Sequence, residues 1–351
     1  MMLPILNRLF SGKISMVALS AGVAAYERGD RPTGRRLLAI ASSAAPDDVM
    51  LHERAAGAAS QAGDHRMTLD LLKNLVRAQP GNVDLQLRAA LAECNLGDEP
   101  GAARRCEDAI AQSIDGEPSA LMGLLAKLRM PGPPRIDLLS SIHNWLRPRT
   151  YVEIGVAQGD SLVLAPPGTR ALGVDPSPQV TRPVPPTTTI FAETSDDFFA
   201  QRDVRALLGG APVELAFIDG MHLFEFALRD FMNLERYCTP GSTILLDDCY
   251  PLDRRSADRN RTSAFWSGDV WRVVPALKKY RPDLRIRTVA APLTGLCIVR
   301  GLDPSSRVIP ENYDAIVKEF LALDYGVLET DRKSFFNLLP NDWERVKEVL
   351  R

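Results

Sequence analysis

The chain has 351 residues, of which 25% are charged and 45% hydrophobic, and its formal net charge is −2. This is the composition of a globular protein, and it excludes a disordered chain, a collagen-like chain and a small disulfide-stabilised scaffold. The nearly balanced charge gives no overall attraction to nucleic acid or to an anionic membrane, so neither is expected as a partner. The length is about twice that of a typical domain, which predicts at least two domains.

The cysteines and the first apolar stretch bear on where the protein resides. The five cysteines are odd in number and show no C-x-x-C spacing, which indicates free thiols in a reducing compartment and predicts a cytoplasmic protein. Residues 14–25 could pass for the apolar part of a signal peptide. They are too few to span a membrane, which takes about 20 apolar residues, and they also fit the first helix of a repeat.

A period of 34 residues runs through the N-terminal third of the chain. Its markers are Gly29-Asp30, Gly63-Asp64 and Gly97-Asp98, then Pro46, Pro80 and, in the third equivalent place, Ile114. Glycine can end a helix in the left-handed conformation, aspartate can cap the next helix, and proline cannot continue one. Each unit therefore predicts two helices joined by a Gly-Asp turn, such as 49–61 and 67–78.

These units resemble tetratricopeptide repeats over residues 15–116. Small residues lie in two columns where the helices of that family meet closely, although the middle unit departs from the pattern. The columns hold Gly34, Thr68 and Ala102, and Ala41, Leu75 and Ala109. Residues 118–130 would form the terminal capping helix. The resemblance implies an all-α tetratricopeptide-like domain at 1–130 that docks a protein partner or a second copy of the chain, and that carries no chemistry itself.

The pattern changes after the prolines at 131, 133 and 134, which mark a linker. Only two aromatic residues, Phe10 and Tyr26, precede it. After an expected helix at 136–146, short apolar runs alternate with helical segments, which is typical of a parallel α/β sheet. The seven expected strands are 151–156, 171–174, 188–191, 213–218, 243–246, 285–289 and 296–299. We expect an α/β domain at 131–301 and a helical extension at 302–351, packed on a domain face or in a homo-oligomer interface.

Glycines after the first expected strand suit the close approach of a ligand. The run from Glu153 through Gly155 to Gly159 would let the backbone turn tightly against it. Ala157 stands where the G-x-G-x-x-G dinucleotide motif has its second glycine, which argues against NAD. Asp175 ends the second strand, where an acidic side chain can bind both hydroxyls of a ribose. The alternative is an aspartate that only orders the following turn.

Polar residues also follow the third, fourth and fifth expected strands. Ser195 and Asp196 could meet the edge of an adenine, and they would also fit the first turn of a helix. Asp219 follows the fourth strand, and Asp247 and Asp248 follow the fifth. Three carboxylates at adjacent strand ends repel one another unless a cation lies among them, which is typical of a Mg²⁺ site. Alternatively, they cap a loop and order a turn.

The order and spacing of these elements resemble the class I S-adenosylmethionine-dependent methyltransferases, in particular an O-methyltransferase-like group with an I-D-G-x-H element and a paired aspartate. The segments that carry the resemblance are 194–198, 217–222, 246–248, 266–271 and 281–284. The resemblance covers 150–301 and implies a Rossmann-like seven-stranded methyltransferase sheet. It also implies methyl transfer from S-adenosylmethionine to a hydroxyl of a sugar, a glycan or another small molecule, with a divalent cation such as Mg²⁺ as a second cofactor.

The family's functional positions carry over residue by residue. The implied cofactor ligands are Glu153, Gly155 and Gly159 for the methionine end, Asp175 for the ribose, and Ser195 with Asp196 for the adenine. The implied metal ligands are Asp219, Asp247 and Asp248. His222, three residues after Asp219, would be the catalytic base, because a histidine with a pKa near 6.5 can take a proton at neutral pH. Alternatively, His222 orients Asp219 or packs in the loop.

The segment 251–271 is long for a loop after a strand, and we expect it to cover the site. It contains Arg254, Arg255, Arg259 and Arg261, followed by Trp266 and Trp271. The arginines could grip a phosphate or carboxylate and the indoles could stack on a sugar. The alternative is a solvated basic loop with Trp271 buried.

The competing interpretation is an interaction protein that binds the cofactor without turnover, its helical repeats doing the biological work. A NAD-dependent oxidoreductase is a more distant alternative. The enzyme is favoured because all six polar residues of the family's pattern are present, and a protein without turnover would not need them. They are Glu153, Asp175, Asp219, His222, Asp247 and Asp248.

Overall fold

The computed structural model describes residues 2–113, 118–262 and 264–351, and within them the side chains from residue 12 onward except that of residue 329. The chain divides into two compact units, Met1–Arg129 and Met130–Arg351. The predicted repeat position Ile114 lies outside the described residues. No helix in the described part of the chain is both long and apolar enough to cross a membrane.

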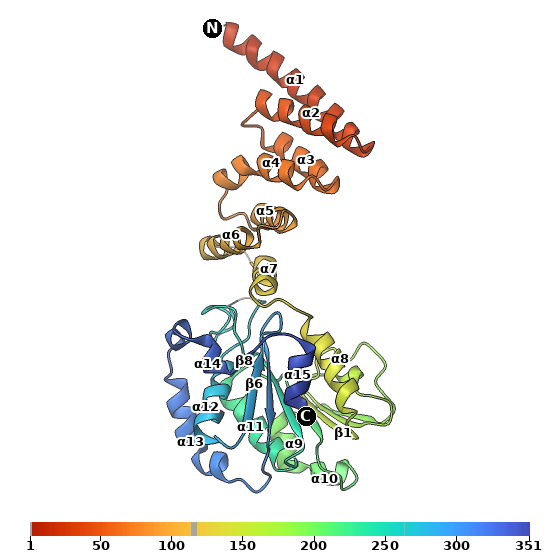
Figure 1. Ribbon diagram of the computed structural model, residues 1–351, viewed down its shortest axis with the longest axis vertical. Helices are drawn as coiled ribbons and strands as arrows, with labels where there is room; N and C mark the ends of the chain where they lie inside the picture. Colours follow the sequence, from red (N-terminus) through yellow and green to blue (C-terminus); the bar gives the residue numbers. More distant parts are fainter. Residues whose placement is uncertain (1, 114–117, 263) are drawn as a thin grey trace. The chain divides into compact units, whose positions relative to one another are not determined.

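The N-terminal unit is built from helices that pack in sequential pairs (Figure 1). They are α1 (Met2–Glu27), α2 (Arg31–Ala44), α3 (Val49–Gln61), α4 (His65–Ala78), α5 (Val83–Asn95), α6 (Glu99–Gln112) and α7 (Ser119–Arg129). The predicted helical segments, including the last one at 118–130, are therefore present. That these pairs are tetratricopeptide-like stays a prediction.

The Gly-Asp turns between paired helices have the predicted form. Gly29, Gly63 and Gly97 all have φ between 68° and 81°, the left-handed conformation that glycine adopts without strain. The aspartate after each glycine is the N-cap of the following helix and accepts a hydrogen bond from a backbone N–H in its first turn. The 34-residue period is therefore the period of a structural unit of two helices.

The second unit contains one mixed sheet with strand order β3-β2-β1-β4-β5-β7-β6-β8. The strands are β1 (Thr150–Ile154), β2 (Arg170–Val174), β3 (Thr188–Phe191), β4 (Leu215–Ile218), β5 (Thr243–Asp247), β6 (Arg285–Val289), β7 (Leu296–Arg300) and β8 (Leu338–Leu339). Strands β1 to β5 are parallel, and β7 runs antiparallel to β5 and β6. All seven predicted strands are present.

The eighth strand corrects the expectation of a purely helical tail. Leu338 and Leu339 pair with Thr288 and Val289 at the edge of the sheet. A strand of two residues has no alternating pattern that the sequence could reveal. The tail completes the sheet, and its helix α13 (Val308–Leu321) packs on α11 (Phe224–Glu235) and α12 (Val273–Tyr280). Residues 302–351 are therefore part of the second unit.

Helices cover both faces of this sheet (Figure 1). They are α8 (Arg135–Leu146), α9 (Ser195–Gln201), α10 (Val204–Leu207), α11 (Phe224–Glu235), α12 (Val273–Tyr280), α13 (Val308–Leu321), α14 (Arg332–Phe336) and α15 (Trp343–Leu350), with single 3₁₀ turns η1 (Leu162–Leu164), η2 (Val270–Arg272) and η3 (Tyr325–Glu329). One face packs residues such as Ile154 and Leu246 against α11, α12 and α13. The other packs Tyr151, Phe217 and Leu245 against α8 and α15. Burial on both faces fixes the central strands, so their carboxyl ends form a rigid edge.

Candidate active site

A cavity of about 800 Å³ lies beyond the carboxyl ends of β1, β2, β4 and β5. This is where open α/β sheets bind their ligands, and the volume suits a small molecule. Most of the residues predicted from the sequence line it, namely Gly155, Asp175, Ser195, Asp196, Asp219, His222, Asp247 and Asp248. The structure therefore brings the glycine loop after β1 and the polar residues that follow β2, β3, β4 and β5 together around one cavity.

Two predicted cofactor ligands, Glu153 and Gly159, are not among the residues that line the cavity. Glu153 is fully buried and accepts hydrogen bonds from the hydroxyls of Tyr151 (2.5 Å) and Ser161 (2.7 Å). Burial raises the pKa of Glu153 to about 8, although these hydrogen bonds lower it. Because Ser161 itself lines the cavity, Glu153 supports the glycine loop from beneath.

Asp175 organises the loop that follows β1. Its Oδ2 accepts hydrogen bonds from the backbone N–H groups of Val156 and Ala157, each at 2.9 Å. Gly155 has φ of 87° and Ala157 has φ of 45°, so the loop turns sharply in the left-handed region. Asp175 Oδ1 also accepts a hydrogen bond from the N–H of Ser177 (2.7 Å), so the alternative role, in which it orders the turn that follows it, is present. A ribose-binding role stays a prediction.

Ser195 and Asp196 begin helix α9, which Thr194 caps. The carboxylate of Asp196 forms a two-pronged ion pair with Arg229 of α11, with both nitrogen–oxygen distances at 2.6 Å. The helix-start interpretation of these residues is therefore correct. An adenine contact by Asp196 stays a prediction, and this ion pair would have to share the carboxylate with it.

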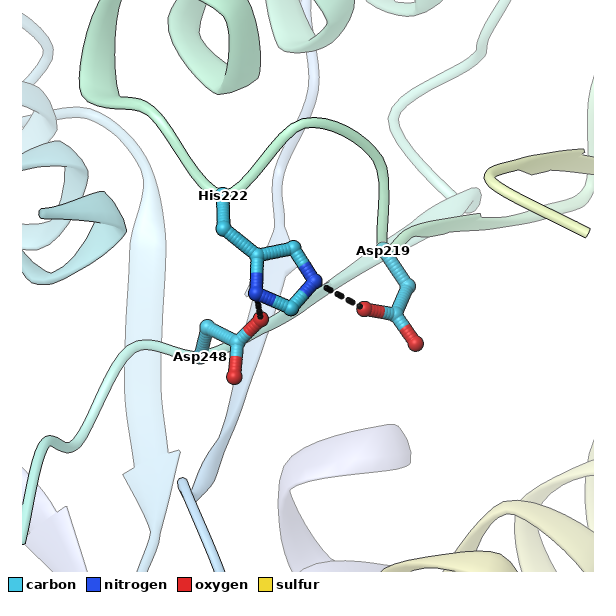
Figure 2. A group of neighbouring side chains, drawn as sticks. All are labelled: Asp219, His222 and Asp248. Carbon is cyan, nitrogen blue, oxygen red and sulfur yellow. Dashed lines mark ion pairs between the residues drawn. The ribbon is translucent and has the colours of Figure 1, made fainter. Parts of the chain in front are cut away.

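His222 lies between two carboxylates (Figure 2). Its Nε2 is 3.2 Å from Asp219 Oδ1, and its Nδ1 is 2.9 Å from Asp248 Oδ2. His222 and Asp248 have φ of 56° and 59°, which is uncommon for residues with a side chain and is typical of functional sites. One atom each from Asp219, His222 and Asp248 lies within 4.8 Å of the others.

The two carboxylates change the proton affinity that the sequence suggested for His222. Burial by itself would lower the pKa of His222, but Asp248 and Asp219 outweigh it and raise the pKa to about 11. In this arrangement the ring carries a proton at neutral pH. A charged imidazolium has no lone pair with which to take a further proton, so this geometry does not by itself favour His222 as the base, and that role stays a prediction.

Asp247 turns toward a residue that the sequence did not single out. The guanidinium of Arg135, the first residue of α8, is in direct ion-pair contact with Asp247 Oδ2 and lies 3.2 Å from Asp219 Oδ2. Two of the three predicted metal ligands therefore already face a cation. The only available hint was that three carboxylates need a positive charge. Nothing in the sequence pattern pointed to Arg135.

The loop 251–271 covers the site with aromatic rather than basic side chains. Phe265 and Trp266 line the cavity, whereas none of the loop's arginines does. Arg259 pairs instead with Glu225 and Asp269, each at 2.7 Å. The expected grip of these arginines on a phosphate or carboxylate is not supported. Trp271 is fully buried, as the alternative interpretation proposed.

Asp269 is a second residue that the sequence analysis missed. It is fully buried, its Oδ1 accepts a hydrogen bond from the N–H of Phe224 (2.8 Å), and its own N–H donates to the carbonyl of His222 (3.2 Å). It thereby fixes the backbone that carries His222. No motif announces this role, because it depends on the loop folding back onto the turn after β4.

Residues 152–249 match the family model of a methyltransferase domain. The match runs from β1 to just past the paired aspartates, and it agrees with the methyltransferase-like α/β sheet of the second unit. No curated protein matches the chain.

The solved structures to which this chain is similar include two O-methyltransferases. The O-methyltransferase TomG from Streptomyces achromogenes, in complex with SAM, is 16% identical and has a TM-score of 0.39, with 55% of this chain and 93% of that chain covered. An O-methyltransferase from Bacillus cereus, in complex with SAH, is 16% identical and has a TM-score of 0.36, with 49% and 82% covered.

Proposed function

We propose that this protein is an S-adenosylmethionine-dependent methyltransferase that methylates a hydroxyl group of a small molecule. The observation that carries the proposal is the cavity at the carboxyl ends of the parallel strands, which is lined by the glycine loop and the carboxylates of a segment that matches a methyltransferase domain.

The charge of the cavity supports a cationic cofactor. Its lining includes seven aspartates, of which burial raises the pKa of Asp230 to about 7, and two cationic side chains, Arg135 and His222. The carboxylates belong to Asp160, Asp175, Asp196, Asp219, Asp230, Asp247 and Asp248. A net negative, partly enclosed site attracts a positive ligand and disfavours an anionic one. S-adenosylmethionine carries a sulfonium and an ammonium group, whereas a NAD pyrophosphate would be repelled.

The cofactor's orientation follows from the predicted ligands that line the cavity. Its methionine end would lie against the loop at Gly155, its ribose near Asp175, and its adenine near Ser195 and Asp196. This leaves the part of the cavity beside His222 and Trp266 for the acceptor.

The lining at that end supports a neutral acceptor with an apolar face. Met221, Phe265, Trp266 and Leu293 are among the residues that line the cavity, and aromatic side chains stack on sugar rings and on planar rings alike. The arginines that suggested a phosphorylated acceptor do not line the cavity. An uncharged sugar or phenolic hydroxyl fits this surface better than a nucleotide-sugar.

Methyl transfer is a direct displacement in which the acceptor oxygen forms a bond to the methyl carbon while the carbon–sulfur bond breaks. Holding the three atoms in line can contribute about 7 to 11 kcal/mol. The hydroxyl becomes strongly acidic as the new bond forms, so a nearby carboxylate suffices as proton acceptor. We assign this role to Asp219, with His222 holding its carboxylate in place.

A divalent cation at Asp219, Asp247 and Asp248 would lower the pKa of the acceptor hydroxyl when bound. Two of these three ligands face the guanidinium of Arg135, so this set of three carboxylates does not fit a metal as it is arranged here. The mechanism above therefore uses the side chains of the chain alone.

The test is transfer of an isotopically labelled methyl group from S-adenosylmethionine to a panel of sugars, polyols and phenols. Asp219→Asn and His222→Ala should lower the rate at least about tenfold, a loss of about 1.4 kcal/mol in transition-state stabilisation. Asp70→Asn and His65→Ala, in the helical unit, are the matched controls and should not change it. Cofactor binding with no labelled product across the panel would instead support the interaction protein.

A further inference from the structure

Arg135 reaches the cavity from outside the sheet. It is the first residue of α8, directly after Pro133 and Pro134, and proline fixes the backbone before the helix begins. Its side chain is 35% exposed, lines the cavity, and places its guanidinium carbon 5.9 Å from the centre of the Phe217 ring. A short rigid segment thus delivers a permanent positive charge to the ends of β4 and β5.

Asp247 depends on this charge. The side chain of Asp247 is 1% exposed, and apart from its ion pair with Arg135 neither carboxylate oxygen has a hydrogen-bond partner among the residues that the structure describes. A buried carboxylate without a cation or hydrogen bonds is strongly destabilising. Arg135 therefore compensates the charge of Asp247, and it shares Asp219 with His222.

A metal ion and Arg135 would compete for the same atoms. A divalent cation held by the three carboxylates would use an oxygen of Asp219 and one of Asp247, and the Oδ2 atoms of both face the Arg135 guanidinium. The other oxygen of Asp219 and the Oδ2 of Asp248 are each paired with a ring nitrogen of His222. Two cations at the same carboxylates repel each other, so one excludes the other.

We propose that Arg135 is the resident cation of this site, which takes the place of a divalent metal and makes the protein metal-independent. In this role Arg135 is a positioning residue: it holds Asp219 and Asp247 together at the cavity wall. The inference deepens the proposed function at the same site. Its main consequence, that removing the guanidinium uncovers a metal site, needs no turnover to be tested.

The experiment is a titration of the chelator-treated full-length protein with Mn²⁺, followed by calorimetry and by the electron paramagnetic resonance signal of free Mn²⁺. Wild type and Arg135→Lys should bind no stoichiometric Mn²⁺. Arg135→Met should bind one ion at least about tenfold more tightly than wild type, because the competing charge is gone. Adding Asp247→Asn to Arg135→Met should remove that binding.

Arg149→Met is the matched control. Arg149 is 81% exposed, and its ion pair with Glu214 (2.7 Å) involves no cavity-lining residue, so this variant should behave as wild type. Stoichiometric Mn²⁺ binding by wild type that Asp247→Asn or Asp248→Asn abolishes would overturn the proposal, whether or not Arg135→Met folds. If wild type methylates an acceptor, a chelator should leave the rate unchanged, and loss of the rate restored by Mn²⁺ would also overturn it.

Discussion

The indole ring of Trp266 lies almost parallel to the imidazole ring of His222, with the ring centroids 5.4 Å apart and an angle of 17° between the planes. The Nδ1 of His222 is also 3.3 Å from the carbonyl oxygen of Trp266. The loop that covers the cavity is therefore joined to the turn after β4 by both a ring contact and a backbone contact. Positioning of His222 depends on this loop.

Trp266→Ala should lower kcat/KM for the acceptor about tenfold, since an aromatic contact of this kind contributes about 0.5 to 1.5 kcal/mol. Trp266→Phe should keep most of the activity. The measurement is the steady-state rate of methyl transfer. Trp145→Ala, at an exposed position of α8, serves as the control, and an unchanged rate for Trp266→Ala would show that the ring contact does not position His222.

Gly155→Ala should both destabilise the second unit and abolish cofactor binding. Gly155 has φ of 87°, and an added Cβ would clash with the backbone carbonyl oxygen of Asp219. Gly210 has nearly the same φ, 86°, with nothing within 4 Å of such a Cβ, so Gly210→Ala measures the backbone strain alone, about 1 to 2 kcal/mol.

The two glycine variants are compared by urea unfolding followed by tryptophan fluorescence, which reports on the second unit because all four tryptophans follow residue 131. Gly155→Ala should be less stable than Gly210→Ala by at least about 1 kcal/mol, the lower range for forcing an extra carbon into a packed site. Equal losses for the two would mean that the strand ends adapt to the extra carbon.

The contribution of His143 to the stability of the second unit should fall as the pH is lowered from neutrality. This side chain is 1% exposed on α8, and burial lowers its pKa from 6.5 to about 4. The unfolded chain then takes up a proton that the folded one resists, so the contribution is fully present above pH 6.5 and is lost as the pH falls toward 4.

Between about pH 7 and pH 5 the wild type should lose about 2 kcal/mol more than His143→Leu in the same fluorescence-monitored urea unfolding. The comparison with the variant cancels the contributions of the carboxylates. Parallel pH profiles for the two proteins would rule out a neutral, buried His143.

Asp64→Ala should destabilise the helical unit far more than Asp98→Ala, although both aspartates cap a helix of the repeat. Asp64 is 4% exposed and accepts hydrogen bonds from the Tyr26 hydroxyl (2.8 Å) and the Arg35 guanidinium (2.8 and 2.9 Å). Asp98 caps α6 by accepting a hydrogen bond from the N–H of Gly101, and it does so at an exposed position. We expect about 3 kcal/mol for Asp64→Ala and about 1 kcal/mol for Asp98→Ala.

The measurement for the aspartate pair is amide hydrogen exchange of α2 to α4 and of α6 in the full-length protein. Faster exchange in α2 to α4 of Asp64→Ala, with a smaller change in α6 of Asp98→Ala, would confirm the difference. Similar changes in both would mean that the bonds to Tyr26 and Arg35 add little to the cap.

The sequence allowed most of the fold to be predicted because its signals are local. The Gly-Asp turns specify the helix pairs, and the apolar runs specify β1 to β7. Strand β8 escaped prediction because its two residues, Leu338 and Leu339, form a strand only by pairing with β6. Glu153 was predicted as a cofactor ligand, but it lies buried beneath the glycine loop. A sequence motif gives the residue type and spacing, and it does not show which side chains are buried.

In the site, the sequence predicted which side chains gather at the strand ends, but not which cation balances the charge of the carboxylates. Asp219, His222, Asp247 and Asp248 lie at one edge because adjacent parallel strands end there. Arg135 is 84 residues from Asp219 in the chain, and only the packing of α8 brings it to the carboxylates. For the same reason the pKa of His222 could not be read from its type, since it depends on two carboxylates from different strands.

The central claim is that the cavity binds S-adenosylmethionine, and isothermal titration calorimetry of the chelator-treated wild-type protein tests it most directly. We expect saturable heat with one S-adenosylmethionine per chain, none with NAD, and loss of the heat in Gly155→Ala but not in Gly210→Ala. No heat with S-adenosylmethionine, with or without Mg²⁺, would contradict the account.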